Sequence, residues 1–166
     1  MDKFLTVFAV FDDQTQRKLS ALQAKVFELG NPGTQTMGIP FHLTLGSFPT
    51  DKECELVKRI KESAKTHAQF DIGLLKINHF GDKVVFVEPE VNESLMQLHN
   101  LFDCNYPYGH PYHAHATIFQ GDSEATKQAK ALLAEIFTPF SAKIVSIQMG
   151  EFFPTRMIIS ENLIEN

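Results

Sequence analysis

The tripeptide His-x-Thr occurs twice in this chain, each time inside a short apolar run that alternates like a half-buried strand. The two runs are Phe41–Leu45 and Ala114–Ile118. Side chains at positions i and i+2 of a strand point to the same face. His42 and Thr44 therefore present an imidazole and a hydroxyl side by side, and His115 and Thr117 do the same. The other residues of each run are expected to face a core.

The surroundings of the two motifs repeat as well. At the same distance after each motif the chain reaches a helix N-cap residue, which is Thr50 in the first copy and Ser123 in the second. An amphipathic helix follows each time, and then two β-like runs joined by a turn. A duplicated strand–helix–hairpin unit would place the two His-x-Thr strands as counterparts that face a shared cleft.

Hydrophobic periodicity predicts the remaining elements. Residues 4–11 form an apolar run that we interpret as a buried first strand. A helix is predicted over residues 13–30 with Leu29 on its buried face, and another over about 90–102 that buries Val91. The strands of the two hairpins are predicted at 70–77 with 83–87 and at 140–149 with 156–160.

Composition limits the class of protein. With 166 residues, 43% of them hydrophobic, the chain is expected to form one domain of two closely fused lobes. The net charge of −5 argues against an extended nucleic-acid surface but permits a small cleft for a nucleotide end. Cys54 and Cys104 are expected to be unpaired thiols in a reducing compartment. No stretch has membrane-spanning length, and we expect a cytoplasmic monomer.

The paired motifs suit chemistry at phosphorus. Two imidazoles on either side of one substrate can accept and donate a proton, because the ordinary histidine pKa of about 6.5 lies near working pH. The β-branched threonine side chain is stiff, so a strand can hold its hydroxyl ready for a phosphoryl oxygen. Attack on phosphorus depends mostly on positioning and charge stabilisation. The motifs therefore predict a phosphodiester site that needs neither a metal ion nor another cofactor.

The sequence resembles the 2H phosphoesterase superfamily, and specifically its bacterial 2′-5′ RNA ligase-like members. The likeness covers essentially the whole chain and is carried by His42-Leu43-Thr44-Leu45 and His115-Ala116-Thr117-Ile118. It implies a bilobal α+β fold with antiparallel sheets around a central cleft. It also implies metal-independent opening of 2′,3′-cyclic phosphates of nucleotides or RNA ends.

Carried over to this chain, the resemblance gives each motif residue a role. His42 would protonate the leaving 3′ oxygen, and His115 would activate water, although the pseudo-symmetry leaves the reverse open. Thr44 and Thr117 would hold the phosphate. The chain departs from the family pattern at Gln120, where an arginine is common, and at Ala114, where a proline is common.

The segment 105–113 holds every tyrosine of the chain. Aromatic rings beside a nucleotide cleft can stack on a base. The candidates for substrate contact in this segment are Tyr106, Tyr108, Tyr112 and His113.

Three alternatives to a cyclic phosphodiesterase stay open. The same site could act on 2′-5′ linkages as a ligase or phosphodiesterase, since ligation reverses cleavage. A 2H protein that binds nucleotides without turnover is the second. The third is a metal-binding module at His110, His113 and His115, which form a dense imidazole cluster in the sequence.

Overall fold

Residues 2–165 are described by the computed structural model, and within them seven strands form one antiparallel sheet. The strand order is β2-β1-β6-β3-β4-β5, and β7 pairs with β6. The strands are β1 (Phe4–Phe11), β2 (His42–Pro49), β3 (Phe70–Phe80), β4 (Val84–Pro89), β5 (Ala116–Gln120), β6 (Phe140–Phe152) and β7 (Arg156–Asn162). The helices are α1 (Asp13–Phe27), α2 (Glu53–Thr66), α3 (Glu93–Leu101) and α4 (Ser123–Ile136), with a 3₁₀ helix at Thr50–Lys52.

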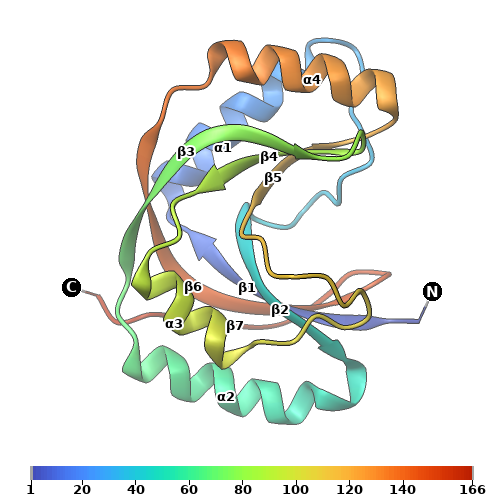
Figure 1. The fold of residues 1–166 in the computed structure, drawn as a ribbon. Coiled ribbons are helices and arrows are strands. Elements are labelled where there is room, and N and C mark those ends of the chain that lie inside the picture. The colour runs from blue at the N-terminus through green and yellow to red at the C-terminus, as the bar shows by residue number, and fades with distance from the viewer. Residues whose placement is uncertain (1, 166) are drawn as a thin grey trace.

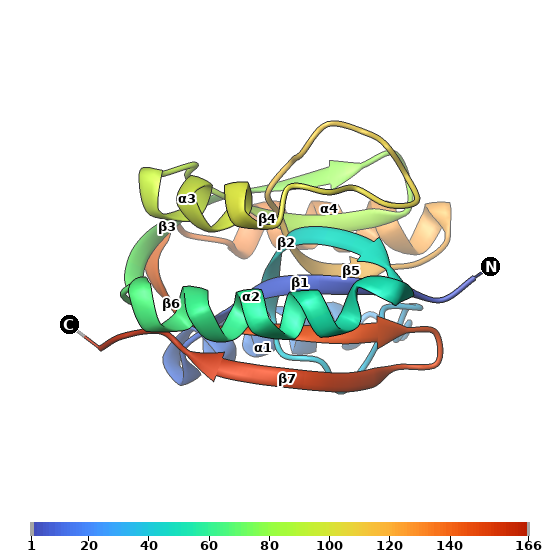
Figure 2. The ribbon, with the colours of Figure 1, turned by 90° about the horizontal axis from the view of Figure 1, so that it is seen from below.

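The sheet bends around an open side of the molecule, and the helices cover its outer face (Figure 1). Helices α1 and α4 pack against each other, with α4 on β3, β4 and β5 and α1 on β5. Helix α2 contacts β6 and β7, and Figure 2 shows it running alongside β7. Helix α3 contacts β2.

The elements of the two predicted repeat units interlock in the sheet. Strand β2 of the first unit lies in the same half as the β6–β7 hairpin of the second, whereas β5 pairs with the β3–β4 hairpin of the first. The thirteen-residue β6 joins the halves, because residues 144–152 pair with β1 and residues 140–144 with β3. The predicted α+β class with antiparallel strands is confirmed.

The first strand is buried along its whole length, as predicted. It lies between β2 and β6, and both of its faces are covered. The residues that pack under the helices in the main core are Leu5, Val7, Ala9 and Phe11. Those that form a second, smaller cluster with Phe152 are Phe4, Phe8 and Val10.

The helix predicted from residue 13 begins at Asp13, whereas the two predicted N-caps, Thr50 and Ser123, are displaced by two residues and one residue. The side chain of Asp12 accepts a hydrogen bond from Thr15 N at 3.0 Å and so caps α1. Asp122 caps α4 in the same way, one residue before the predicted Ser123. Thr50 opens the 3₁₀ helix instead, and α2 begins at Glu53 without a side-chain cap.

The helices predicted over 13–30 and 90–102 are both shorter in the structure, and their outermost apolar residues are exposed. Leu29 lies beyond the end of α1 and is 47% exposed. Val91 precedes Asn92, whose side chain caps α3, and is 65% exposed. Strands β3 and β6 instead extend three residues beyond their predicted ends. Among residues 2–165, none of the helices combines the length and apolar character needed to cross a membrane.

Candidate active site

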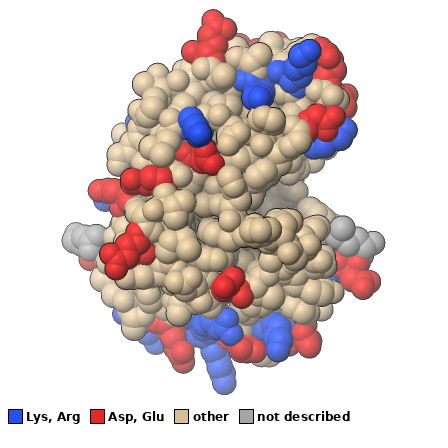
Figure 3. All heavy atoms as spheres, in the orientation of Figure 1, with Lys and Arg blue, Asp and Glu red and all other residues tan. Residues whose placement is uncertain are grey.

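A cleft of about 970 Å³ opens on the inner face of the sheet. Figure 3 shows the molecule hollowed between its two halves. A cleft of this volume is typical of small-molecule sites. The predicted site residues that line it are His42, Thr44, Tyr108, His113, His115 and Thr117. Both motifs therefore meet one opening, although they are far apart in the sequence.

Each motif strand contains a β-bulge directly after its threonine. The extra residue in β2 is Leu45, because the residues on either side of it pair with two consecutive residues of β1. The extra residue in β5 is Ile118, whose neighbours pair with two consecutive residues of β4. A bulge shifts the alternation of the side chains that follow it. Ser47 and Gln120, which come five residues after the two histidines, therefore line the cleft as well.

The carbonyl groups of the two bulged residues receive hydrogen bonds from side chains. His99 Nδ1 lies 2.8 Å from the Leu45 oxygen. Gln23 Nε2 donates to the Ile118 oxygen, also at 2.8 Å. Because a bulge interrupts the ladder and a buried carbonyl needs a partner, these two side chains stabilise the local backbone that aims each motif.

The two motif imidazoles are held by the same local contact. His42 Nδ1 lies 2.8 Å from the oxygen of Pro40, and His115 Nδ1 lies 2.7 Å from the oxygen of His113. Each partner is the carbonyl two residues earlier in the chain. A carbonyl oxygen only accepts, so Nδ1 carries the proton and Nε2 of each neutral ring is left as the acceptor.

Both motif imidazoles are kept neutral at neutral pH. Burial, helped by the charge of His115 and opposed by the hydrogen bond to Pro40, lowers the pKa of His42 to about 4. Burial also lowers the pKa of His115, and the nearby His113 and His110 add to this effect. An anionic ligand between the rings would raise both pKa values again, because opposite charge favours the imidazolium.

Helix α1 supports both motif strands. The side chain of Gln16 accepts from Phe41 N and donates to Phe41 O, each at 2.8 Å, and Phe41 directly precedes His42. Gln23 lies seven residues further along the same helix face and contacts Ile118 of β5. Two turns, or about 10.5 Å of helix, separate the two glutamines. A single rigid element therefore contacts the first motif strand near its start and the second near its bulge.

The three predicted tyrosines lie in different surroundings. Tyr108 lines the cleft and is 52% exposed. Tyr112 stacks on His99 with the ring centroids 3.6 Å apart. Tyr106 packs against the smaller core cluster around Phe8. Among the described residues that line the cleft, Tyr108 is the one tyrosine, so the structure places Tyr106 and Tyr112 in supporting contacts instead.

His113 lines the cleft but is paired with a carboxylate. Its Nε2 lies 2.9 Å from Glu88 Oε1. Burial alone raises the pKa of Glu88, but the hydrogen bonds from Lys76 and His113 together outweigh it and lower the pKa. No three His, Cys, Asp or Glu side chains within residues 2–165 are arranged to hold a metal ion. The imidazole cluster of the sequence is therefore not gathered into a metal site.

An aromatic wall, of which only Tyr108 was predicted from the sequence, lines one side of the cleft. The wall consists of Phe4, Tyr108, Phe152 and Phe153. The Phe4 ring lies 6.2 Å from the rings of both Tyr108 and Phe153, measured between centroids. Phe153 is 58% exposed. A large apolar residue in the turn of a hairpin, next to Pro154, was the signal available in the sequence.

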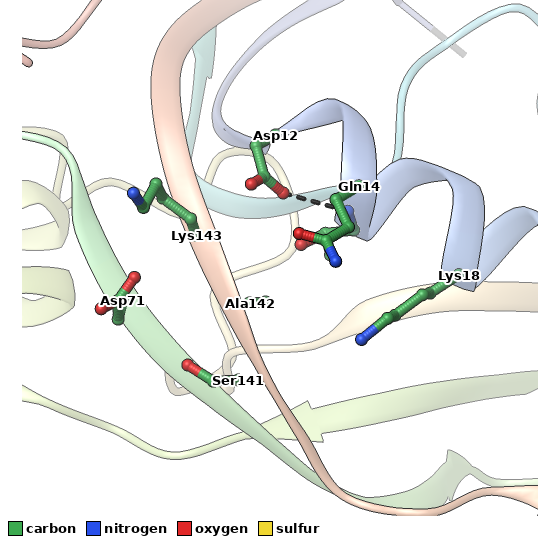
Figure 4. A pocket seen from close by; sticks show the side chains of 8 residues that line it. Asp12, Gln14, Lys18, Asp71, Ser141, Ala142 and Lys143 are labelled. Carbon is green, nitrogen blue, oxygen red and sulfur yellow. Dashed lines mark hydrogen bonds between the residues drawn. The ribbon is translucent and has the colours of Figure 1, made fainter.

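A second, smaller pocket of about 170 Å³ lies at the start of α1, away from the motifs (Figure 4). Its charged lining residues are Asp12, Lys18, Asp71 and Lys143, so the formal charges balance. The carboxylate of Asp12 is already used to cap α1. None of the predicted site residues line this pocket, and its chemistry suggests no ligand.

A bent antiparallel sheet that carries two His-x-Thr strands on one cleft defines a 2H phosphoesterase. The chain belongs to the 2′-5′ RNA ligase superfamily, whose family profile matches residues 38–151 and so includes both motifs. A comparison with curated proteins finds no significant match.

Solved structures with the same fold include E. coli LigT and a protein from Thermus thermophilus. LigT complexed with 3′-AMP is 18% identical, with a TM-score of 0.66 over 97% of this chain and 98% of that chain. LigT in apo form is 17% identical, with a TM-score of 0.65 over 98% of both chains. TT0787 of Thermus thermophilus is 14% identical, with a TM-score of 0.64 over 98% of this chain and 99% of that chain. At these identities the similarity shows the fold.

Proposed function

We propose that this protein is a phosphodiesterase that opens 2′,3′-cyclic phosphates of nucleotides or RNA ends, with two histidines as acid and base and without a metal ion. The observation that carries the proposal is the matched setting of His42 and His115. Both rings line one cleft, and each has its Nδ1 bound to a carbonyl and its Nε2 left for proton transfer. Paired acid and base groups of this kind contribute about 10²–10⁴-fold each to a rate.

In the proposed reaction, water attacks phosphorus on the side opposite the 3′ oxygen. Nε2 of His115 takes a proton from the water as the new P–O bond forms. Nε2 of His42, protonated beforehand, gives its proton to the 3′ oxygen as the P–O3′ bond breaks, and a 2′-phosphate remains. Thr44 and Thr117 donate hydrogen bonds to the non-bridging oxygens, which gain charge in the transition state. The negative charge of the bound phosphate raises the pKa of both imidazoles. Because the pKa of His42 in the free protein is only about 4, the proposal includes the reverse assignment, with His115 as the acid and His42 as the base.

The proposed substrate is a nucleotide or a short RNA end, with the base against the aromatic wall. Stacking on an aromatic ring contributes about 1–3 kcal/mol per base. LigT, which shares the fold, has been crystallised with 3′-AMP and with ATP. Both ligands are nucleotides that would suit a cleft of this volume. The proposed active form is a cytoplasmic monomer.

A second candidate function at the same site is cleavage or formation of 2′-5′ linkages. It is favoured by the family profile, which describes 2′-5′ RNA ligases. Cleavage of a 2′-5′ linkage by the neighbouring 3′ hydroxyl yields a cyclic phosphate, so the two reactions share one phosphorus centre and one pair of imidazoles.

A turnover screen tests both candidates. Nucleoside 2′,3′-cyclic phosphates and 2′-5′ linked dinucleotides are incubated with the protein in EDTA, and the products are identified by ³¹P NMR. We expect conversion of the cyclic phosphates to 2′-phosphates. The double variant His42→Ala/His115→Ala is the control and should be inactive. Turnover that EDTA abolishes, or that the double variant retains, would refute the proposed mechanism.

A further inference from the structure

The two motif strands are not hydrogen-bonded to each other. They lie at opposite ends of the strand order β2-β1-β6-β3-β4-β5, so the ladder that connects them runs through four other strands. Small changes of twist between successive strands add up along such a sheet. The separation of the two imidazoles therefore depends on contacts that connect β2 and β5 more directly.

Besides helix α1 and the direct packing of β2 on β5, two attachments made by three hydrogen bonds connect the strands, and they are reciprocal. Tyr112, three residues before His115, donates its hydroxyl to the carbonyl oxygen of Thr44 at 3.0 Å. In the other direction, the loop that precedes His42 contacts β5 at Gln120. There Thr34 N donates to Gln120 O at 2.7 Å, and Gln120 N donates to Gln35 Oε1 at 3.1 Å. Each segment that leads into one motif is thus attached to the strand of the other.

We propose that Tyr112 and Gln35 are positioning residues that set the separation of the His42 and His115 imidazoles across the cleft. The inference rests on the proposed function, in which both rings act on one phosphorus atom. Neither side chain touches a motif imidazole in the hydrogen bonds described above, so each acts through the backbone to which it bonds. A displacement of about 1 Å in a reacting group can cost about 10²-fold in rate.

Local packing makes both attachments firm. The Tyr112 ring is stacked on His99 with an interplanar angle of 10°, and His99 itself bonds to β2 at Leu45 O. Burial raises the pKa of the Tyr112 hydroxyl, so it stays a donor at every working pH. On the other side, Gly33 has a φ of +70°, and a Cβ there would collide with Gln120 O. The loop can approach β5 this closely because that position is glycine.

The test uses Tyr112→Phe, Gln35→Met and the double variant, which keep most of the side-chain volume. Tyr112→Phe removes the bond to Thr44 O. Gln35→Met removes the bond from Gln120 N, together with the bond from Gln35 Nε2 to Pro32 O, and leaves the backbone bond from Thr34 N to Gln120 O in place. With a nucleoside 2′,3′-cyclic phosphate we expect kcat to fall about tenfold in each single variant and about 100-fold in the double variant. KM should change by less than about twofold, because the phosphate and base contacts remain. Ser63→Ala, which removes a hydrogen bond to Arg59 O within α2, is the matched control and should keep normal kcat.

A second measurement needs no turnover. The imidazole pKa values are measured by NMR in the same variants. Because the charge of His115 contributes to the lowered pKa of His42, separation of the rings should raise the His42 pKa in Tyr112→Phe and Gln35→Met but not in Ser63→Ala. If both variants keep kcat within about twofold and an unchanged His42 pKa, the inference is overturned. If the wild type turns over no cyclic phosphate, the proposed function fails, and the pKa comparison alone decides whether the two attachments set the ring separation.

Discussion

The two copies of the motif share their local geometry but differ in what surrounds them. His42 lies against Phe8, with ring centroids 4.4 Å apart and an interplanar angle of 40°. His115 instead meets Phe80 and Phe86 edge-on, at 4.7 and 5.3 Å. The residues near His115 also include His113 with its partner Glu88. The first imidazole thus packs on one aromatic ring, whereas the second meets two rings edge-on and has an ionisable pair, His113 and Glu88, nearby.

This difference teaches that equal motifs need not have equal proton affinities. The bond from Nδ1 to the carbonyl two residues earlier is the same in both halves, and so is the bulge after the threonine. The environment supplied by the rest of the fold differs, and it lowers the pKa of His42 as far as about 4. Whether the two halves act as equals can be tested by substitution in each.

The largest effect is expected from loss of either imidazole. His42→Ala and His115→Ala should each lower kcat by about 10²–10⁴-fold, because each removes one of the two proton transfers. Steady-state kinetics on a cyclic phosphate measures this, with thermal unfolding as the control for folding. A single variant with near-normal kcat would show that the halves do not act as an acid and base pair.

Loss of either threonine hydroxyl is expected to be the next largest effect. Thr44→Val and Thr117→Val keep the β-branched shape and remove one hydrogen-bond donor to the phosphate. Removal of one donor to a developing oxyanion typically costs about 10²–10³-fold in kcat. Two losses of similar size would show that the halves share the phosphate equally. An effect confined to one variant would assign the phosphate to that half.

The aromatic wall belongs to the half that contains β1 and β6, and its removal should affect binding. Tyr108→Ala should lower kcat/KM by about 5- to 150-fold through KM, which corresponds to about 1–3 kcal/mol of stacking. Tyr108→Phe keeps the ring and is the matched control. Equal KM values in wild type and Tyr108→Ala would place the base elsewhere in the cleft.

The pH dependence should reflect both lowered pKa values. In the proposed mechanism the active form of the free protein has one imidazole protonated and the other neutral, so this form is most populated between the two pKa values. Since both lie below 6.5, the bell of kcat/KM should peak on the acid side of pH 6.5. The bound phosphate raises both pKa values, so kcat should peak at higher pH. A kcat/KM optimum above about pH 7 would contradict this.

The smallest effect concerns stability. The pKa of His42 falls from 6.5 in the unfolded chain to about 4 in the folded protein. Between these values the unfolded state binds more protons, so the free energy of unfolding should fall as the pH drops from 6.5 to about 4. Denaturant titrations of wild type and His42→Gln measure this. The variant should lose less stability over that range, and parallel curves would show that His42 is not buried as described.

The periodicity of the sequence was sufficient for the fold class and for the direction of the motif side chains. Strand β1 follows from its continuous apolar run, which is buried on both faces. The burial of Leu43, Ala116 and Ile118 in the core follows from alternation, because successive side chains of a strand point to opposite faces. The spacing of Cys54 and Cys104 offered no reason to pair them, and both are free thiols. Helix ends were less certain, since Asp12 and Asp122 compete with their neighbours as caps.

The tertiary structure alone decided which residues join the motifs in the cleft. A bulge depends on the register between two strands, so no local pattern predicted that Ser47 and Gln120 would face the cleft after the bulges at Leu45 and Ile118. The sequence predicted Tyr112 as a substrate contact, but its hydroxyl donates a hydrogen bond to Thr44 O, 68 residues away. The sequence determined two strands with matched chemistry. The separation of the two motif strands, the pKa values of His42 and His115 and the aromatic wall of the cleft come from contacts between segments that are distant in the chain.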